Sequence, residues 1–194
     1  MSKVRTWRFA LLAIGLVAAM GVIVCAEYAV QKPSFAIRKV DKKVVLYTIH
    51  RGSYDKTGLA TGKLFALAGQ KGITPQGPVS YAYLNNPELV SSEHWLTEIR
   101  IPVAKEALKF AGTLGEMTDV KTLSAAEVAV AIKAEGQADP GPIYEGLQLW
   151  IIKQGYMASE GPIETFLTNV MSGDYGRMKT EIMIPIQKLP GNED

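Results

Sequence analysis

Short runs in which apolar and polar residues alternate recur along the chain, separated by Gly, Pro and Asn, and such runs are typical of β-strands. In the first part of the domain they span Val44–His50, Pro78–Leu84 and Trp95–Val103. Between the first two runs, Leu59–Lys71 places Leu64 and Ala68 at helical spacing and stops before Gly72, a good helix terminator. The pattern predicts the order β-α-β-β.

The second part of the chain repeats this order with different side chains. Strands are predicted at Glu127–Gly136, Pro162–Thr168 and Lys179–Ile186, and a helix at Pro142–Gly155. The hexapeptide TEIRIP at Thr97–Pro102 returns as TEIMIP at Thr180–Pro185. We therefore interpret the hexapeptide as the last strand of a unit that is present twice.

Other positions follow the spacing of the two hexapeptides. Gly72 maps onto Gly155 and Val40 onto Leu123 with an offset of 83, and Gly77-Pro78 maps onto Gly161-Pro162 with one inserted residue. The expected domain covers residues 37–188, with halves at about 37–103 and 119–188, followed by a tail at 189–194. Consecutive strands in each half are expected to pair as a hairpin, with the helix over one sheet face.

The N-terminus has a different composition. Phe9–Ala26 carries no charge and follows Lys3, Arg5 and Arg8, so it is long enough to cross a bilayer with the basic end in the cytoplasm. Residues 1–27 are thus expected to be a membrane anchor and 28–36 a tether, with the domain on the extracytoplasmic side. A signal peptide cleaved after Ala26 is the alternative, but the apolar run exceeds a typical signal core.

Composition narrows the classes of function. Of 194 residues 47% are hydrophobic and 21% charged, and the net charge of +2 leaves no basic stripe for nucleic acid. The single cysteine, Cys25, lies in the N-terminal apolar run, so no disulfide is expected in the domain. His50 and His94 lack a second imidazole at ligand spacing, and we expect neither a metal nor another cofactor.

The doubled segments resemble a known family. The stretches HRGSYDKTG, LFALAGQKGITPQGPVSYAYLNNP and GPIYEGLQLWIIKQGYMASEGPIETFLTNV are similar to the gyrase-inhibitor-like (GyrI-like) family, also called the AraC-type effector-binding domain. The markers are a Gly after the first strand, a helix that ends in Gly, a Gly-Pro before the third strand, and an Ile-x-Ile-Pro ending. The resemblance covers both halves, at about residues 37–188.

This resemblance implies an α+β fold in which two β-α-β-β units form a pseudo-twofold sandwich around a central groove for small molecules. The family includes multidrug-sensing parts of transcriptional regulators, gyrase-modulating proteins and hydrolases of cyclopropane-bearing genotoxins. A predicted membrane segment stands where such regulators carry a helix-turn-helix, so we do not expect this chain alone to regulate transcription.

Strand alternation sorts the charged residues of the hexapeptides. Thr97, Ile99 and Ile101 share the face expected under the helix, whereas Glu98 and Arg100 share the other face. Glu181 takes the position equivalent to Glu98. The two glutamates are either symmetry-related groups that face a groove or solvated strand residues.

Glu164 is the sharpest candidate for chemistry. It follows Gly161-Pro162 by two residues, where the first half has Ser80. The family resemblance implies a Glu-x-Tyr whose Glu reaches the ligand pocket, but this chain has Phe166 in place of the Tyr and thus lacks one hydroxyl. A half-buried carboxylate suits a lipophilic cation, and with a raised pKa it also suits proton transfer.

Aromatic residues supply the remaining candidates for a ligand-binding wall. Besides Phe166 these are Trp95, Trp150, Tyr83 and Tyr144, each of which could instead pack in the core. Trp150 and Tyr144 are six residues apart on one predicted helix, so at most one of them is expected to reach a ligand.

Three hypotheses follow from these features. The first is a membrane-anchored exported domain that binds small amphipathic or cationic molecules in a groove between the repeats. The second is a hydrolase of strained electrophiles in which Glu164 acts as acid or base. The third is a protein-interaction domain whose groove is filled by side chains. A lone carboxylate without a nucleophile or metal set favours binding over catalysis.

Overall fold

The computed structural model describes residues 34–137, 139–168 and 178–191. The chain divides into two units, Met1–Lys32 and Pro33–Asp194, and the described residues all belong to the second. The expected anchor or signal at residues 1–27 therefore lies outside the described residues. Within the described ranges, no helix has the length and apolar character needed to cross a bilayer.

The described part of the second unit contains two α-helices and nine strands. The helices are α1 (Thr57–Gln70) and α2 (Gly141–Lys153). The strands are β1 (Phe35–Val40), β2 (Lys43–Arg51), β3 (Ser80–Tyr83), β4 (Leu96–Val103), β5 (Thr118–Leu123), β6 (Ala126–Lys133), β7 (Tyr156–Ala158), β8 (Ile163–Phe166) and β9 (Thr180–Lys188). The predicted α+β class is confirmed, and every strand pair is antiparallel.

The strands form one sheet in the order β1-β6-β9-β8-β3-β4-β2-β5, and the short strand β7 adds to β9. The predicted hairpin partners do pair, β3 with β4 in the first half and β8 with β9 in the second. The halves join at the centre, where β3 pairs with β8. Because this central pair is antiparallel, the two halves are related by a pseudo-twofold axis.

Each half begins with a strand that the hydrophobic pattern did not predict. β1 and β5 start at equivalent positions of the two halves, Phe35 and Thr118, so the repeated unit is β-β-α-β-β rather than β-α-β-β. β1 contains the last two residues, 35 and 36, of the stretch expected to be a tether. Four of its six residues are exposed, and such a strand carries no alternation for sequence analysis to detect.

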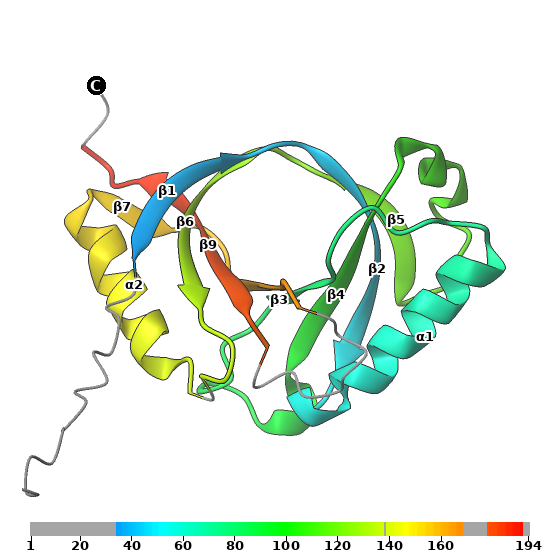
Figure 1. Cartoon of the computed structure of the whole chain (residues 1–194), viewed down its shortest axis with the longest axis horizontal. Helices are drawn as coiled ribbons and strands as arrows, with labels where there is room; N and C mark the ends of the chain where they lie inside the picture. Colours follow the sequence, from blue (N-terminus) through cyan, green and yellow to red (C-terminus); the bar gives the residue numbers. More distant parts are fainter. Residues whose placement is uncertain (1–33, 138, 169–177, 192–194) are drawn as a thin grey trace, which may run out of the picture. The chain divides into compact units, whose positions relative to one another are not determined.

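Both helices cover the same face of the sheet (Figure 1). Leu64 and Ala68 of α1 pack in a cluster with Ile99 and Ile101 of β4. Residues Ile143, Leu147 and Ile151 of α2 pack likewise on Ile182, Ile184 and Ile186 of β9. The isoleucines of the two hexapeptides thus form the floor under each helix, and burial of each side chain stabilises the fold by about 1.5 to 3 kcal/mol.

The sheet is strongly curved, so that two long segments of it, β1-β2 and β5-β6, arch over the face opposite the helices and run from one half to the other (Figure 1). β1 pairs with β6 in the second half and continues into β2, which pairs with β4 in the first. β5 and β6 make the reverse crossing, and both crossings are visible as the blue and green ribbons that arch over the sheet in Figure 1. These crossings form the wall of a cavity that is described below.

The Gly-Pro marker of the second half has a steric cause. A Cβ placed on Gly161 would overlap the carbonyl oxygen of Tyr83, which belongs to the other half. The N–H of Tyr83 donates to the carbonyl of Pro162 at 3.0 Å. Only glycine therefore allows β8 to lie this close to β3.

We expect Gly161→Ala to lower the free energy of unfolding by about 1 to 3 kcal/mol, because the methyl group must push β8 away from β3. Gly62→Ala is the matched control: Gly62 lies inside α1, and nothing approaches its added Cβ within 4 Å. It should stabilise the fold by about 0.4 to 1 kcal/mol. Urea denaturation of the three proteins measures both changes, and similar effects of the two substitutions would contradict the steric argument.

Candidate functional site

Glu164 lies in the middle of β8, opposite Tyr81 of β3 on one side and Ile182 of β9 on the other. Residues directly opposite in a sheet share a face, so Glu164 points toward the face covered by the helices. Its carboxylate accepts a hydrogen bond from the hydroxyl of Tyr144 on α2 at 2.7 Å and another from the hydroxyl of Tyr83 on β3 at 3.0 Å.

Aromatic rings from the first half extend this cluster. Tyr54, at the start of the 3-10 turn η1 (Tyr54–Lys56), stacks on Trp95 with ring centroids 4.3 Å apart. It also meets the ring of Tyr83 edge-on at 5.1 Å. We call Tyr54, Tyr83, Trp95, Tyr144 and Glu164 the Glu164 cluster. All five are half-buried, so one charged group stands among ring faces that remain partly accessible.

The electrostatics of the cluster keep its phenols protonated. Burial raises the pKa of Tyr83 and of Tyr144 well above the ordinary value, and the negative charge of Glu164 raises both further. The pKa of Tyr54 is raised for the same two reasons, burial first. Neutral hydroxyls therefore point at the carboxylate over the whole physiological range of pH.

The strand register corrects the predicted equivalence of Glu164 and Ser80. Tyr81 lies opposite Ile99 and Glu164 lies opposite Ile182, and these two isoleucines are equivalent positions of the repeated hexapeptide. Glu164 thus corresponds to Tyr81, because the first half has one more residue between its Gly-Pro and this position. The contacts agree: Tyr81 bonds the hydroxyl of Thr61 at 2.6 Å, and Thr61 is the α1 equivalent of Tyr144.

The structure brings together four of the candidates from the sequence, namely Glu164, Tyr83, Trp95 and Tyr144. Phe166 instead lies in the core, 3% exposed and edge-on to Tyr81 at 4.7 Å. Trp150 packs on Phe35 of β1, with ring centroids 5.9 Å apart. Sequence analysis missed Tyr54, since a lone Tyr after a strand-ending Gly carries no signal of its own.

Two other tyrosines provide phenol groups for Glu164 in place of the hydroxyl that is missing at Phe166. Tyr83 and Tyr144 come from the other half and from the helix, and both donate to Glu164. The departure from Glu-x-Tyr therefore does not leave this carboxylate without phenol partners. Its setting is that of an oriented anion in an aromatic wall, which can pair with a cation or take part in proton transfer.

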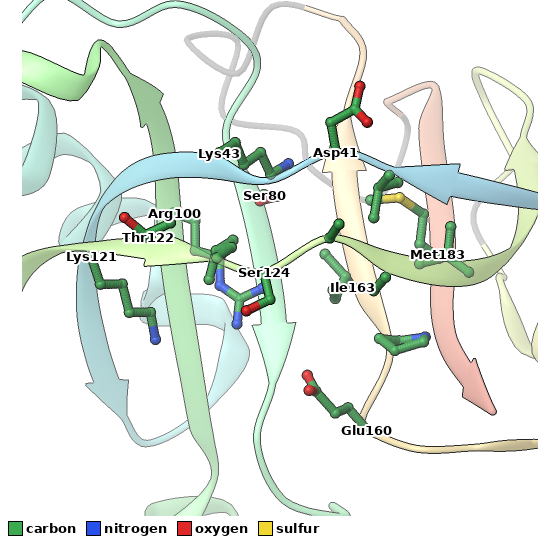
Figure 2. Close-up of a pocket in the computed structure, with 16 residues that line it drawn as sticks. Asp41, Lys43, Ser80, Arg100, Lys121, Thr122, Ser124, Glu160, Ile163 and Met183 are labelled. Carbon is green, nitrogen blue, oxygen red and sulfur yellow. The ribbon is translucent and has the colours of Figure 1, made fainter.

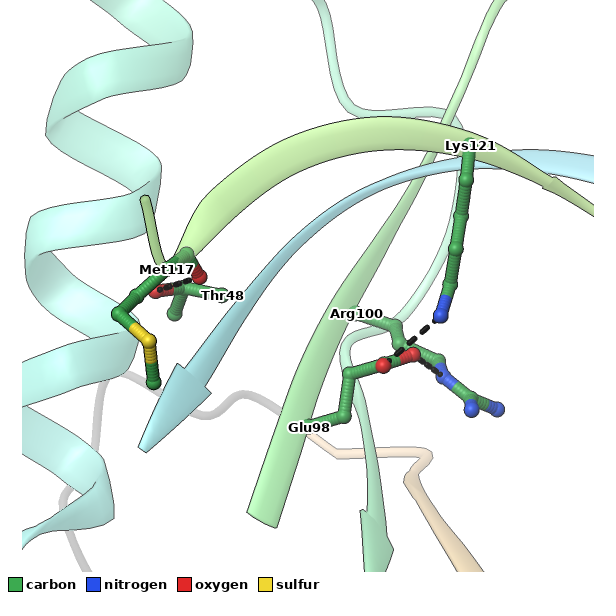
Figure 3. Close-up of polar contacts among 5 residues, drawn as sticks. All are labelled: Thr48, Glu98, Arg100, Met117 and Lys121. Carbon is green, nitrogen blue, oxygen red and sulfur yellow. Dashed lines mark hydrogen bonds and ion pairs between the residues drawn. The ribbon is translucent and has the colours of Figure 1, made fainter. Parts of the chain in front are cut away.

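Glu98 and Glu181 lie on the opposite face of the sheet. Glu98 accepts from Arg100 Nε at 2.6 Å and from Lys121 Nζ at 2.8 Å, as Figure 3 shows. Glu181 accepts from the guanidinium of Arg38 at 3.0 and 2.8 Å. Arg38 and Lys121 are themselves equivalent by the offset that relates the halves, so the repeated glutamate marks a repeated ion pair that ties a crossing strand to the sheet.

A cavity of about 330 Å³ opens on this same face, between the crossing segments and the sheet (Figure 2). Arg100, Ser80, Ile163 and Met183 contribute to it from the sheet. Glu164 is not among its lining residues. The candidates that sequence analysis placed around one groove are therefore divided between two faces, because strand alternation sends Glu164 and Glu181 to opposite sides.

Within the described residues, no group of three or more His, Cys, Asp or Glu side chains is arranged to hold a metal ion.

Residues 18–104 match the model of the GyrI-like small molecule binding domain. This match assigns residues 18–104 to the GyrI-like family. The match begins before the described residues and ends just after β4, so it covers the first of the two repeated units. No curated protein sequence matches the chain significantly.

Solved structures share the GyrI-like fold at low sequence identity. The C-terminal domain of EcmrR is 15% identical with a TM-score of 0.64, and the match covers 81% of this chain and 99% of that domain. In the complex of EcmrR with DNA the TM-score is 0.62 at 16% identity, and the match covers 81% of this chain but only 58% of that protein. A hydrolase from Listeria innocua has a TM-score of 0.56 at 12% identity, with coverages of 81% and 94%.

The raised tyrosine pKa values predict a pH dependence of stability. The folded state holds protons on Tyr83 and Tyr144 more tightly than the unfolded chain, so the free energy of unfolding should fall as the pH rises above about 10. In an ultraviolet absorbance titration, these two tyrosines should ionise only as the fold is lost. Tyr83→Phe and Tyr144→Phe should each remove one of the two tyrosines that ionise only on unfolding.

Glu164→Gln supplies the control for this titration, because loss of the negative charge should lower the pKa of both tyrosines. Complete ionisation of all tyrosines near pH 10, with the near-ultraviolet circular dichroism of the fold retained, would contradict the arrangement.

Proposed function

We propose that this chain binds small lipophilic organic cations at the Glu164 cluster. The observation that carries the proposal is the carboxylate of Glu164, held by two tyrosine hydroxyls and surrounded by rings from both halves of the domain. The description of the family model as a small molecule binding domain agrees with this class of function.

The physical case rests on two attractions that act together. An organic cation at the cluster would pair with the charge of Glu164 and face the rings of Tyr54, Tyr83 and Trp95. A contact between a cation and an aromatic face contributes about 0.5 to 2 kcal/mol, more where water is excluded. The two hydroxyls fix the orientation of the carboxylate before a ligand arrives, which lowers the ordering cost of binding.

Hydrolysis of a strained electrophile is the second candidate, and the two phenol groups around Glu164 favour it. The carboxylate would take a proton from the attacking water while a tyrosine hydroxyl protonated the leaving group. The raised pKa values of Tyr83 and Tyr144 make both phenols weak acids near neutral pH. For that reason we place binding first.

Glu164→Gln should weaken the binding of a hydrophobic dye cation by about 1 to 3 kcal/mol, because the amide keeps the shape but removes the charge. A neutral ligand of similar size should lose much less. Isothermal titration with both ligands measures the difference. Glu181→Gln is the matched control, since it removes a carboxylate from the opposite face of the sheet and should leave cation binding unchanged.

Three outcomes of this series would count against the proposal. Equal losses for the cation and the neutral ligand would mean that Glu164 shapes the site without pairing with charge. Absence of any binding to the wild type would favour the protein-interaction hypothesis. Turnover of a cyclopropane-bearing electrophile by the wild type, lost in Glu164→Gln while ligand binding persists, would establish the hydrolase instead.

We further propose that the domain is exported and stays anchored through the N-terminal segment. The support is the uncharged run Phe9–Ala26 with basic residues on its N-terminal side. An anchored binder outside the cytoplasm would meet lipophilic cations before they reach the inner membrane face.

Protease added to intact spheroplasts should digest the domain while cytoplasmic marker proteins survive. Mass spectrometry of the membrane-bound protein should recover its N-terminal peptide, because an uncleaved anchor keeps it. Full protection of the domain would overturn the orientation, and a mature chain that starts after Ala26 would replace the anchor by a cleaved signal.

A further inference from the structure

The cavity on the sheet face opposite the helices contains the buried guanidinium of Arg100, whose two Nη atoms can still donate hydrogen bonds. The side chain of Arg100 is 10% exposed, and its Nε donates to Glu98 at 2.6 Å. In the described part of the chain, no hydrogen bond is recorded from its two Nη atoms. Figure 2 shows the guanidinium turned into the cavity beside Ser124.

Positive charge exceeds negative charge around this guanidinium. One carboxylate, Glu98, serves both Arg100 and Lys121. Lys43 adds a third cation, for which the described residues record no ion pair. Asp41 and Glu160 also line the cavity, are exposed as Lys43 is, and stand at its upper and lower edges in Figure 2. The end of the cavity around Arg100, Lys121 and Lys43 is therefore cationic, with three positive groups to the one carboxylate of Glu98.

The opposite end of the cavity, where the equivalent residues of the second half lie, is apolar. With the offset of 83, Arg100 corresponds to Met183 and Ser80 corresponds to Ile163, and all four line the cavity. Val40 and Val128 extend the apolar side. Two equivalent halves have thus diverged into a wall of charge and hydroxyl groups facing a wall of hydrocarbon.

We propose that this cavity is a second binding site, for an organic carboxylate with an apolar body. The carboxylate would take hydrogen bonds from the Nη atoms of Arg100 and the ammonium of Lys43, in the paired geometry that a planar guanidinium favours. Ser80 and Ser124 offer further hydroxyl donors. The apolar body would lie against Ile163 and Met183. The volume of about 330 Å³ falls at the lower end of small-molecule pockets.

The electrostatic state of Lys43 supports this assignment. Although much of the residue is exposed, loss of hydration around its ammonium lowers its pKa, and the neighbouring positive charge of Arg100 lowers it further. Glu181 acts in the opposite direction, and Arg38 adds to the lowering. Like charges held near one another repel, and a bound anion would relieve that repulsion.

The inference does not depend on the proposed function of the Glu164 cluster. The two sites lie on opposite faces of the sheet, share no residue and take ligands of opposite charge. Failure of either proposal therefore leaves the other standing.

Isothermal titration of the full chain in lipid nanodiscs tests the site with one ligand skeleton in three charge states: 4-phenylbutyrate, its neutral amide, and 4-phenylbutylamine. Empty nanodiscs correct for partition into lipid. The wild type should bind the carboxylate at least about tenfold more tightly than the amide, because a hydrogen bond between charged groups contributes more to affinity than one between neutral groups. Added salt should weaken the binding of the carboxylate and leave the binding of the amide unchanged.

Two variants copy the other half of the molecule at equivalent positions. Arg100→Met reproduces Met183, and Lys43→Ala reproduces Ala126. Each should raise the Kd for 4-phenylbutyrate about tenfold or more and change the Kd for the amide less than about threefold. Lys39→Ala removes the same charge from exposed β1, away from the cavity, and should change nothing.

Glu164→Gln should also leave 4-phenylbutyrate binding unchanged, which separates this site from the Glu164 cluster. If Arg100→Met prevents folding, Lys43→Ala still decides the question, since no recorded hydrogen bond of the described fold involves its ammonium. Equal affinity of the wild type for carboxylate and amide, or carboxylate binding that survives in Lys43→Ala, would overturn the proposal. So would the absence of carboxylate binding at millimolar concentration.

Discussion

The antiparallel pairing of β3 with β8 is the contact on which the rest of this domain depends. Three residue pairs, Ser80 with Thr165, Tyr81 with Glu164 and Ala82 with Ile163, join two half-sheets into one and set the pseudo-twofold axis. This short ladder needs a glycine at 161, because the chain of the second half runs against the backbone of Tyr83. The same pairing brings the Tyr83 hydroxyl to the Glu164 carboxylate, so the joint and the candidate site are one structure.

The two halves share the residues that hold the sheet together and differ in the residues at the Glu164 cluster and the cavity. Residues that hold the frame are repeated: the buried isoleucines under each helix, and the glutamate that pairs with Lys121 in one half and with Arg38 in the other. Residues at the Glu164 cluster and in the cavity are not repeated, since Glu164 corresponds to Tyr81 and Arg100 corresponds to Met183. Because a symmetric frame tolerates different side chains at its axis, each face can take a distinct chemistry.

The helices and six of the strands were predictable, because apolar residues recur in them at the spacing of a helix or a strand between Gly, Pro and Asn. β1 and β5 were not, because they cross between the halves and β1 stays largely exposed. The candidate site was predictable in part. Glu164, Tyr83, Trp95 and Tyr144 meet as a cluster, but Tyr54 joins them only because the 3-10 turn after β2 returns to Trp95. The single-residue length difference after the Gly-Pro concealed the equivalence of Glu164 with Tyr81.

The sequence by itself determined the duplication, the α+β class and the hexapeptide face that lies under the helices, and it singled out Glu164 as a candidate, because these follow from local spacing and residue type. Only the tertiary structure decided that Glu164 and Glu181 look in opposite directions, that two distant tyrosines donate to Glu164, and that Arg100 and Lys43 share a cavity. Strand register and the crossings between halves control these relations. Both depend on how segments far apart in the chain pack against one another, which no local pattern records.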